Sequence, residues 1–269
     1  MDKDNQHGDL KQDNEEMDWE AFFSDETDEA WERGKKRKNQ RRKVALKIIS
    51  SLLVVVMLIS GLQIWFNLFN IPAIEFLQVS KRLSQNLEVR EYKKSVVTIE
   101  WDGVKGTGFN INENGLIITN EHVVENTDRV NVYFHAGASY IGQVISKNPE
   151  LDLAVIQIEA KNLPVLPLSF EENWEKSEGE KIIFIGNPLS FTQITNEGTI
   201  AGAVLLQDWD VPVMMIDAPV YRGNSGSPVL NQNGEVIGIL FATISSPEGK
   251  NRVGVAIPAF YLKDLLEIQ

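Results

Sequence analysis

The sequence has no cysteine among its 269 residues. This absence excludes disulfide bonds, zinc sites built on thiolates and thiol catalysis, so side-chain packing must stabilise any folded domain. Histidine is scarce too, with three residues, which limits the side chains that could act as a general base near neutral pH. Basic residues do not balance the acidic ones, and the net charge of −12 argues against a general nucleic-acid-binding protein.

Acidic residues are concentrated at the N-terminus. Residues 1–33 are crowded with aspartate and glutamate and are expected to form a disordered tail. Aromatic side chains within this stretch leave open that it folds into a short helix on a cytoplasmic partner; they are Trp19, Phe22, Phe23 and Trp31. A basic block follows at residues 35–43, and we therefore interpret residues 1–43 as an acidic tail that ends in this block.

The basic block leads directly into an apolar run at residues 44–69. No charged residue occurs from Ile48 to Phe66, a stretch of 19 positions. As a helix it would be about 28 Å long, close to the thickness of about 30 Å of a bilayer's hydrocarbon core. The run is too long for a typical signal peptide and lacks a clear cleavage site, so we predict an uncleaved membrane anchor in contact with lipid.

The basic residues on the N-terminal side of this run set the predicted orientation. The positive-inside rule keeps the tail in the cytoplasm and places everything after about residue 70 outside the cell membrane. The contact of the basic block with the apolar run favours this interpretation over a nucleic-acid patch. A single anchor and the absence of cysteine suit a bacterial cell-envelope protein.

After the run, residues 70–89 are expected to form a stalk with a short helix. The sequence that follows consists of short segments that are apolar or that alternate between apolar and polar residues. Two series of about six strands predict an all-β protein made of two barrels or a pair of sandwiches, over residues 90–162 and 163–257. A C-terminal helix is expected at residues 260–268. The predicted strands are Ser95–Glu100, Gly108–Ile111, Leu116–Thr119, Val130–Phe134, Ser139–Ser146, Leu153–Ile158, Lys181–Ile185, Gly198–Leu206, Pro212–Asp217, Pro228–Leu230, Val236–Thr243 and Val253–Ile257.

A candidate nucleophile, Ser225, lies in the Gly-rich stretch 223–228 between two apolar runs. Glycine has no Cβ, so a substrate can approach the backbone beside such a serine closely. His122 is the candidate base, because His7 lies in the tail and His135 ends an alternating strand, where it needs no functional explanation.

An orienting carboxylate must be buried and still reach the imidazole. Asp152 lies within Leu-Asp-Leu-Ala-Val-Ile and fits this description, whereas Asp217 is the competitor. The spacing alone leaves both open.

Several motifs in this order and spacing resemble the HtrA (Deg) family of serine proteases, over roughly residues 90–260. The resemblance implies a chymotrypsin-like double six-stranded β-barrel. It also implies that His122 is the general base, Asp152 its orienting acid and Ser225 the nucleophile, with the amide groups of Gly223 and Ser225 as the oxyanion hole. The motifs are Gly106–Phe109, Thr119–Val124, Asp152–Val155, Ile185–Pro188, Gly223–Pro228, Asn233–Gly238 and Val253–Pro258.

Three features depart from the family pattern. Ser227 stands where a glycine is usual, and Leu189-Ser190 replace the usual Phe-Gly. The sequence stops at Gln269, where family members commonly continue into PDZ domains, so we expect a form without that domain. Trimers are common in this family, and a homotrimer is an expectation of the resemblance alone.

The predicted specificity pocket has Val220 and Tyr221 on one wall and Gly254, Val255 and Ala256 on the other. No acidic residue occurs there, which predicts cleavage after a small aliphatic residue and not after lysine or arginine. No cofactor is implied, and no metal site either, because His122 lacks a second histidine at ligand spacing.

Two functions therefore compete. The first is a membrane-anchored endopeptidase that cleaves misfolded or specific proteins outside the cytoplasm and takes unfolded or extended chains as substrates. The second is a noncatalytic pseudoprotease that binds peptides or signals through the membrane.

Overall fold

The computed structural model describes residues 26–69, 71–188, 191–246 and 252–267. The predicted disorder of residues 1–25, the departure at Leu189-Ser190 and the end of the predicted C-terminal helix lie outside these residues. The chain divides into two compact units, Met1–Leu68 and Phe69–Gln269, and each is described by itself.

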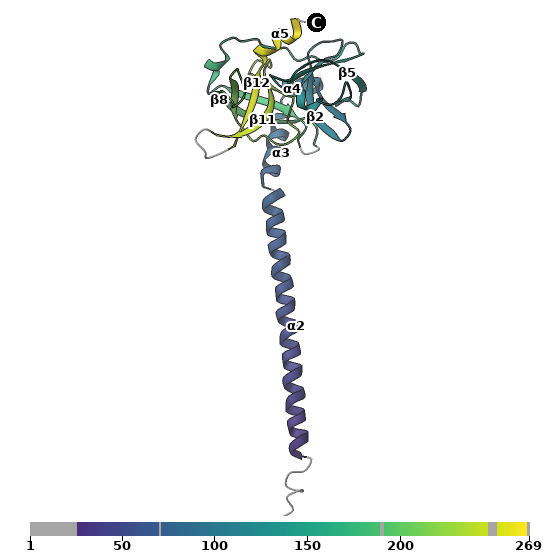
Figure 1. The fold of residues 1–269 in the computed structure, drawn as a ribbon, viewed down its shortest axis with the longest axis vertical. Helices are drawn as coiled ribbons and strands as arrows, with labels where there is room; N and C mark the ends of the chain where they lie inside the picture. Colours follow the sequence, from purple (N-terminus) through teal and green to yellow (C-terminus); the bar gives the residue numbers. More distant parts are fainter. Residues whose placement is uncertain (1–25, 70, 189–190, 247–251, 268–269) are drawn as a thin grey trace, which may run out of the picture. The chain divides into compact units, whose positions relative to one another are not determined.

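The described part of the first unit lies in one continuous helix, α2 (Glu26–Phe69) (Figure 1). Its end agrees with the expected end of the membrane segment, but it begins well before Val44, so residues 26–43 are helical and not part of a disordered tail. Helix-forming Glu, Lys and Arg residues fill this stretch, and no proline interrupts it. Side chains one turn apart support it: Lys36 lies 3.5 Å from Glu32, and the Lys35 ammonium lies 4.5 Å from the centre of the Trp31 ring.

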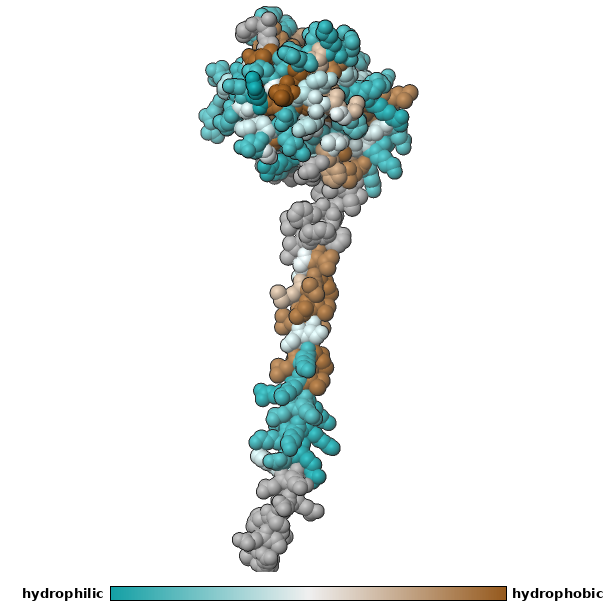
Figure 2. All heavy atoms as spheres, turned by 90° about the vertical axis from the view of Figure 1, so that its right-hand side faces the viewer, coloured by the Kyte–Doolittle hydropathy of each residue, from teal (hydrophilic) through white to brown (hydrophobic). Residues whose placement is uncertain are grey.

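The apolar part of α2 is long enough and apolar enough to cross a membrane, within the stretch Trp31–Leu62. Its large side chains from Val44 to Leu62 are exposed on all sides of the helix. Figure 2 shows them as a brown band next to the teal basic segment. A helix that is apolar all round is stable only where another apolar medium covers it, which supports the predicted anchor.

The first barrel closes in the order β1-β2-β3-β6-β5-β4, with antiparallel neighbours. In β4 the side chains alternate between buried Val130, Val132 and Phe134 and exposed residues, as expected for strands with one face on a core. A turn at Asn112–Gly115 joins β2 to β3, with a hydrogen bond of 3.0 Å from Gly115 N–H to Asn112 O. The strands are β1 (Val96–Trp101), β2 (Val104–Asn110), β3 (Leu116–Thr119), β4 (Arg129–Phe134), β5 (Ser139–Asn148) and β6 (Leu153–Ile158).

The second barrel closes in the order β10-β11-β12-β9-β8-β7, again antiparallel. Two closed six-stranded barrels confirm the predicted fold class. A short 3-10 turn (Ala259–Tyr261) and helix α5 (Leu262–Glu267) follow the last strand. The strands are β7 (Lys181–Gly186), β8 (Ile194–Val204), β9 (Val213–Asp217), β10 (Ser227–Leu230), β11 (Val236–Ser245) and β12 (Arg252–Pro258).

Three apolar clusters hold this unit together. One fills each barrel, and the third lies between them, where Phe109 and Leu153 of the first barrel meet Ile185 and Ile239 of the second. Leu262 of α5 joins the third cluster. Because the two barrels share one core, they are held together as a rigid pair.

The predicted stalk differs from the structure. Residues 70–89 are not one free helix: α3 (Ile71–Leu83) and α4 (Leu87–Ser95) both belong to the same unit as the barrels. The side chain of Asn86 caps α4 by accepting a hydrogen bond of 2.8 Å from Glu88 N–H. The buried Ser80 hydroxyl accepts one of 3.0 Å from Thr195 N–H in β8. The folded unit therefore extends further towards the N-terminus than its strands do.

Candidate active site

His122 lies in a short 3-10 turn, Glu121–Val123, immediately after β3. The following Val123 and Val124 are buried in the core of the first barrel, and Trp101 Nε1 donates a hydrogen bond of 2.6 Å to Val123 O. These contacts fix the turn, while 46% of the His122 side chain stays exposed. The imidazole is thus held in place and open to solvent on one side.

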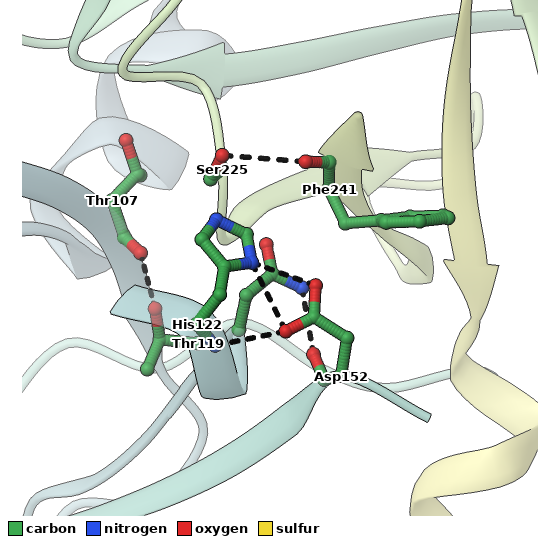
Figure 3. A network of polar contacts seen from close by, with 7 residues as sticks. Thr107, Thr119, His122, Asp152, Ser225 and Phe241 are labelled. Carbon is green, nitrogen blue, oxygen red and sulfur yellow. Dashed lines mark hydrogen bonds and ion pairs between the residues drawn. The ribbon is translucent and has the colours of Figure 1, made fainter. Parts of the chain in front are cut away.

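Asp152 contacts His122 at two points. Its carboxylate oxygens lie 3.0 and 2.8 Å from Nδ1, and Oδ1 also accepts a hydrogen bond of 2.9 Å from the His122 backbone N–H (Figure 3). The hydrogen bond to Asp152 raises the pKa of His122 above its usual value. With Nδ1–H donating to the carboxylate, the neutral ring presents Nε2 as an acceptor towards Ser225.

The backbone of Asp152 has a φ of +49°, a left-handed conformation that is uncommon outside glycine. Asn120 supports it, because its Nδ2 donates a hydrogen bond of 2.9 Å to Asp152 O. The competitor Asp217 lies at the end of β9 and lines a different cavity, next to α4. The structure therefore brings His122 together with Asp152 and not with Asp217.

Ser225 lies on the loop that leads into β10, between two glycines with positive φ, Gly223 (+98°) and Gly226 (+84°). A Cβ on Gly226 would lie 1.9 Å from Thr107 O, so only glycine fits there. The Ser225 hydroxyl donates a hydrogen bond of 3.3 Å to Phe241 O, and the described residues include none between this hydroxyl and His122. Phe241 lies at a bulge where the β11–β12 register shifts, which frees its carbonyl from the sheet.

Thr107 of the first barrel forms hydrogen bonds with the Ser225 loop of the second barrel. Its N–H donates to Ser225 O (2.9 Å) and its hydroxyl donates to Gly223 O (2.8 Å). The Thr107 carbonyl in turn accepts a hydrogen bond of 2.7 Å from the Thr119 hydroxyl. Both loop carbonyls are thus turned towards Thr107, while the N–H groups of Gly223 and Ser225 have no hydrogen-bond partner among the described residues.

A cavity of about 420 Å³ lies beside Ser225. Val220 and Tyr221, two residues of the predicted specificity pocket, line it. Gly254 packs behind Val220, since a Cβ on it would lie 2.7 Å from Val220 Cγ2, and Val255 and Ala256 are fully buried. The structure instead lines the cavity with residues that the sequence did not single out: Arg222, Leu240, Phe241, Ala242, Thr243 and Arg252.

Sequence reasoning also missed the supporting roles of Thr107 and Asn120. Both belong to motifs that were noted, but their partners are distant in sequence. Their burial as polar residues inside apolar segments was the available signal, because a buried polar group must find a partner. For metals, no cluster of three or more His, Asp or Glu side chains suited to an ion occurs among the residues described.

Comparison with known proteins matches residues 106–239 to the model of the trypsin-like peptidase domain. The protein named "Probable periplasmic serine endoprotease DegP-like" from Chlamydia muridarum is 37% identical over 170 residues, which are 62% of this chain and 34% of that protein. "Serine protease HTRA1" from Xenopus laevis is 38% identical over 147 residues, or 52% of this chain and 32% of that protein. The chain thus matches about a third of the length of these relatives.

Solved structures show the same likeness. The serine endoprotease from Yersinia pestis has 28% identity and a TM-score of 0.58, and the match covers 67% of this chain and 64% of that one. The HtrA-type protease AlgW with decapeptide has 24% identity and a TM-score of 0.59, covers 67% of this chain and 65% of that one, and shows a likeness of fold alone.

Proposed function

This chain carries a trypsin-like peptidase domain of the HtrA (Deg) type, and from that premise we propose that it is a membrane-anchored serine endopeptidase. The observation that carries the proposal is the placement of Ser225 beside an imidazole that Asp152 holds at 2.8 Å through its Nδ1. This arrangement leaves Nε2 free to take a proton from the serine.

In the proposed reaction, Ser225 Oγ attacks a peptide carbonyl while His122 Nε2 removes the hydroxyl proton. The imidazolium so formed is stabilised by Asp152 and then protonates the leaving amine. A water molecule repeats the sequence on the acyl-enzyme, which releases the acid product and restores Ser225. The Ser225 hydroxyl must first leave Phe241 O, its present partner, and a bound substrate would favour that rotation because catalytic hydrogen bonds often tighten only in the complex.

The amide groups of Gly223 and Ser225 are the proposed oxyanion hole. Neither has a partner among the described residues, and Thr107 holds the neighbouring carbonyls away from them. Two such donors stabilise the negative charge that develops on the tetrahedral intermediate, and losing one typically lowers turnover by about 100- to 1,000-fold.

Extended protein segments are the proposed substrates. The pairing of β10 with β11 ends at Ser227 and Leu240, so no strand of the described residues pairs with β11 residues 241–245 on the edge that faces Ser225. An extended chain can add to such an edge as another strand, which selects unfolded segments over folded ones. A decapeptide in the AlgW structure is consistent with this class of ligand for the fold.

The proposed location is the cell membrane, with the N-terminal tail in the cytoplasm and the protease domain outside it. The apolar helix within Trp31–Leu62 and the periplasmic relatives support this arrangement.

The test compares casein hydrolysis by the detergent-solubilised full chain and its Ser225→Ala variant. We expect loss of nearly all activity in Ser225→Ala. The matched control is Ser227→Ala in the same loop: the Ser227 hydroxyl is buried without a hydrogen-bond partner among the described residues, so its removal should leave activity nearly unchanged. If neither wild type nor Ser225→Ala hydrolyses casein and both still bind peptides, the result would instead support the noncatalytic peptide-binding function.

A further inference from the structure

Helix α3 contacts both loops that flank the oxyanion hole. Its Phe76 is 1% exposed, and the ring lies 5.1 Å from that of Tyr221 and 6.0 Å from that of Phe191, measured between centroids. Phe76 is far from both residues in sequence, and neither the fold nor the proposed reaction requires an aromatic side chain from this helix.

The first of these loops is the one that carries Ser225. Tyr221 lines the cavity beside Ser225, and its carbonyl accepts a hydrogen bond of 3.1 Å from Asn224 N–H. The Tyr221 backbone is therefore bonded to the residue between Gly223 and Ser225. A shift of the Tyr221 ring would move the peptide groups that supply the two proposed oxyanion donors.

The second loop contains Asn187 and Phe191, and Phe191 N–H donates a hydrogen bond of 2.8 Å to Pro188 O. Asn187 O lies so close to Gly223 that a Cβ there would be 2.6 Å away. Phe76 thus packs against aromatic rings from both sides of Gly223.

The position of α3 is itself fixed. Ser80 accepts a hydrogen bond from Thr195 N–H, and the Arg82 guanidinium pairs with the Glu197 carboxylate at 2.5 Å. Both partners lie on β8, which follows the second loop directly. The Phe76 ring therefore belongs to a helix that two polar contacts, those of Ser80 and Arg82, hold against the second barrel.

We propose that Phe76 is a positioning residue for the oxyanion hole, acting through Tyr221 and Phe191. The inference rests on the proposed protease function. It predicts that loss of the Phe76 ring lowers kcat with little change in KM, because the two amide groups act mainly on the transition state. The pH dependence should not change, because the His122–Asp152 pair lies in the first barrel and does not contact Phe76.

The experiment measures kcat and KM for a peptide substrate with the full chain in detergent. Phe76→Ala should lower kcat about 10- to 100-fold, the effect of misplacing catalytic groups by about an ångström. Phe76→Leu keeps most of the apolar volume and should fall between Phe76→Ala and wild type. Gln78→Ala, an exposed position on the same helix, is the matched control and should stay near wild type.

Thermal melting checks that each variant is folded, and if Phe76→Ala is not, Phe76→Leu carries the test. A folded variant with wild-type kcat, or one with raised KM and unchanged kcat, overturns this inference and leaves the protease function standing. A shifted acid limb of the pH profile would also overturn it. A wild-type chain that is as inert as Ser225→Ala overturns both.

Discussion

At the scale of single residues, Asp152 binds the ring Nδ1 and the backbone N–H of His122 with one carboxylate. The first contact selects the tautomer with a free Nε2, and the second fixes the turn that carries the ring. Asn120 holds the strained backbone of Asp152 from the other side. The orientation of the imidazole thus depends on polar contacts that form only when β3 and β6 pair.

Replacing Asp152 by asparagine should lower kcat by about 10⁴-fold, because an amide NH₂ facing Nδ1 favours the wrong tautomer. The hydrogen bond that raises the pKa of His122 would also be lost, so that pKa should fall. Only the neutral imidazole accepts a proton, and activity therefore declines as the pH drops through this pKa.

We accordingly expect the acid limb of kcat/KM against pH to lie above the usual histidine value in wild type and to move to lower pH in Asp152→Asn. Asp217→Asn is the matched control, since Asp217 lines another cavity. If the acid limb of the kcat/KM profile lies at the same pH in wild type and in Asp152→Asn, the proposed role of Asp152 as the orienting acid of His122 is contradicted.

At the scale of elements, the site forms where the β11 bulge, the glycine loop and β2 meet. The bulge at Phe241 directs a carbonyl at Ser225, and Thr107 of β2 holds the loop carbonyls. Beyond the bulge, β11 lines the cavity together with Val220 and Tyr221. The same strand therefore supplies the proposed edge for the substrate backbone and part of the pocket for its side chain.

This pocket is expected to accept small aliphatic residues before the cleaved bond and to reject lysine and arginine. None of its described lining residues is acidic, and two exposed arginines, Arg222 and Arg252, are among them, so a cationic side chain would meet repulsion and no partner. Matched peptides that differ only in valine, alanine or arginine at this position should show kcat/KM at least about 10-fold higher for the aliphatic residues. Cleavage mainly after arginine would refute this pocket assignment.

At the scale of the whole molecule, the chain joins a domain with a buried core to a helix that exposes large apolar side chains from Val44 to Leu62. An exposed apolar surface of this kind is favourable in a bilayer and unfavourable in water, and this observation supports the proposed membrane anchorage.

Two arginines introduced at Val55 and Leu58, in the middle of the apolar band, should weaken anchorage, because each costs about 2.5–3.5 kcal/mol at the centre of a spanning helix. Alkaline extraction of membranes should then release the variant while wild type stays in the pellet. Arginines at Glu32 and Gln40 of the same helix, outside the band, are the control and should not release the protein. Release of wild type would contradict the anchor.

The sequence alone determined what depends on local pattern. Alternating and apolar segments predict the strands, the charge-free run predicts the apolar helix, and the motifs around His122, Asp152 and Ser225 identify the candidate side chains. Such features are set by neighbouring residues, so they can be read without knowing which segments meet.

Only the tertiary structure decided which distant groups support these side chains. Thr107 and Gly223 are 116 positions apart, and Arg82 and Glu197 are 115 apart. The residues of α3 carry no catalytic motif, and the sequence predicted only a stalk at this position. Their packing against β8 and the Ser225 loop could not be predicted from it. Barrel closure and the packing of helices on it bring such residues together, and contacts of this range depend on the whole chain's packing and not on any local pattern.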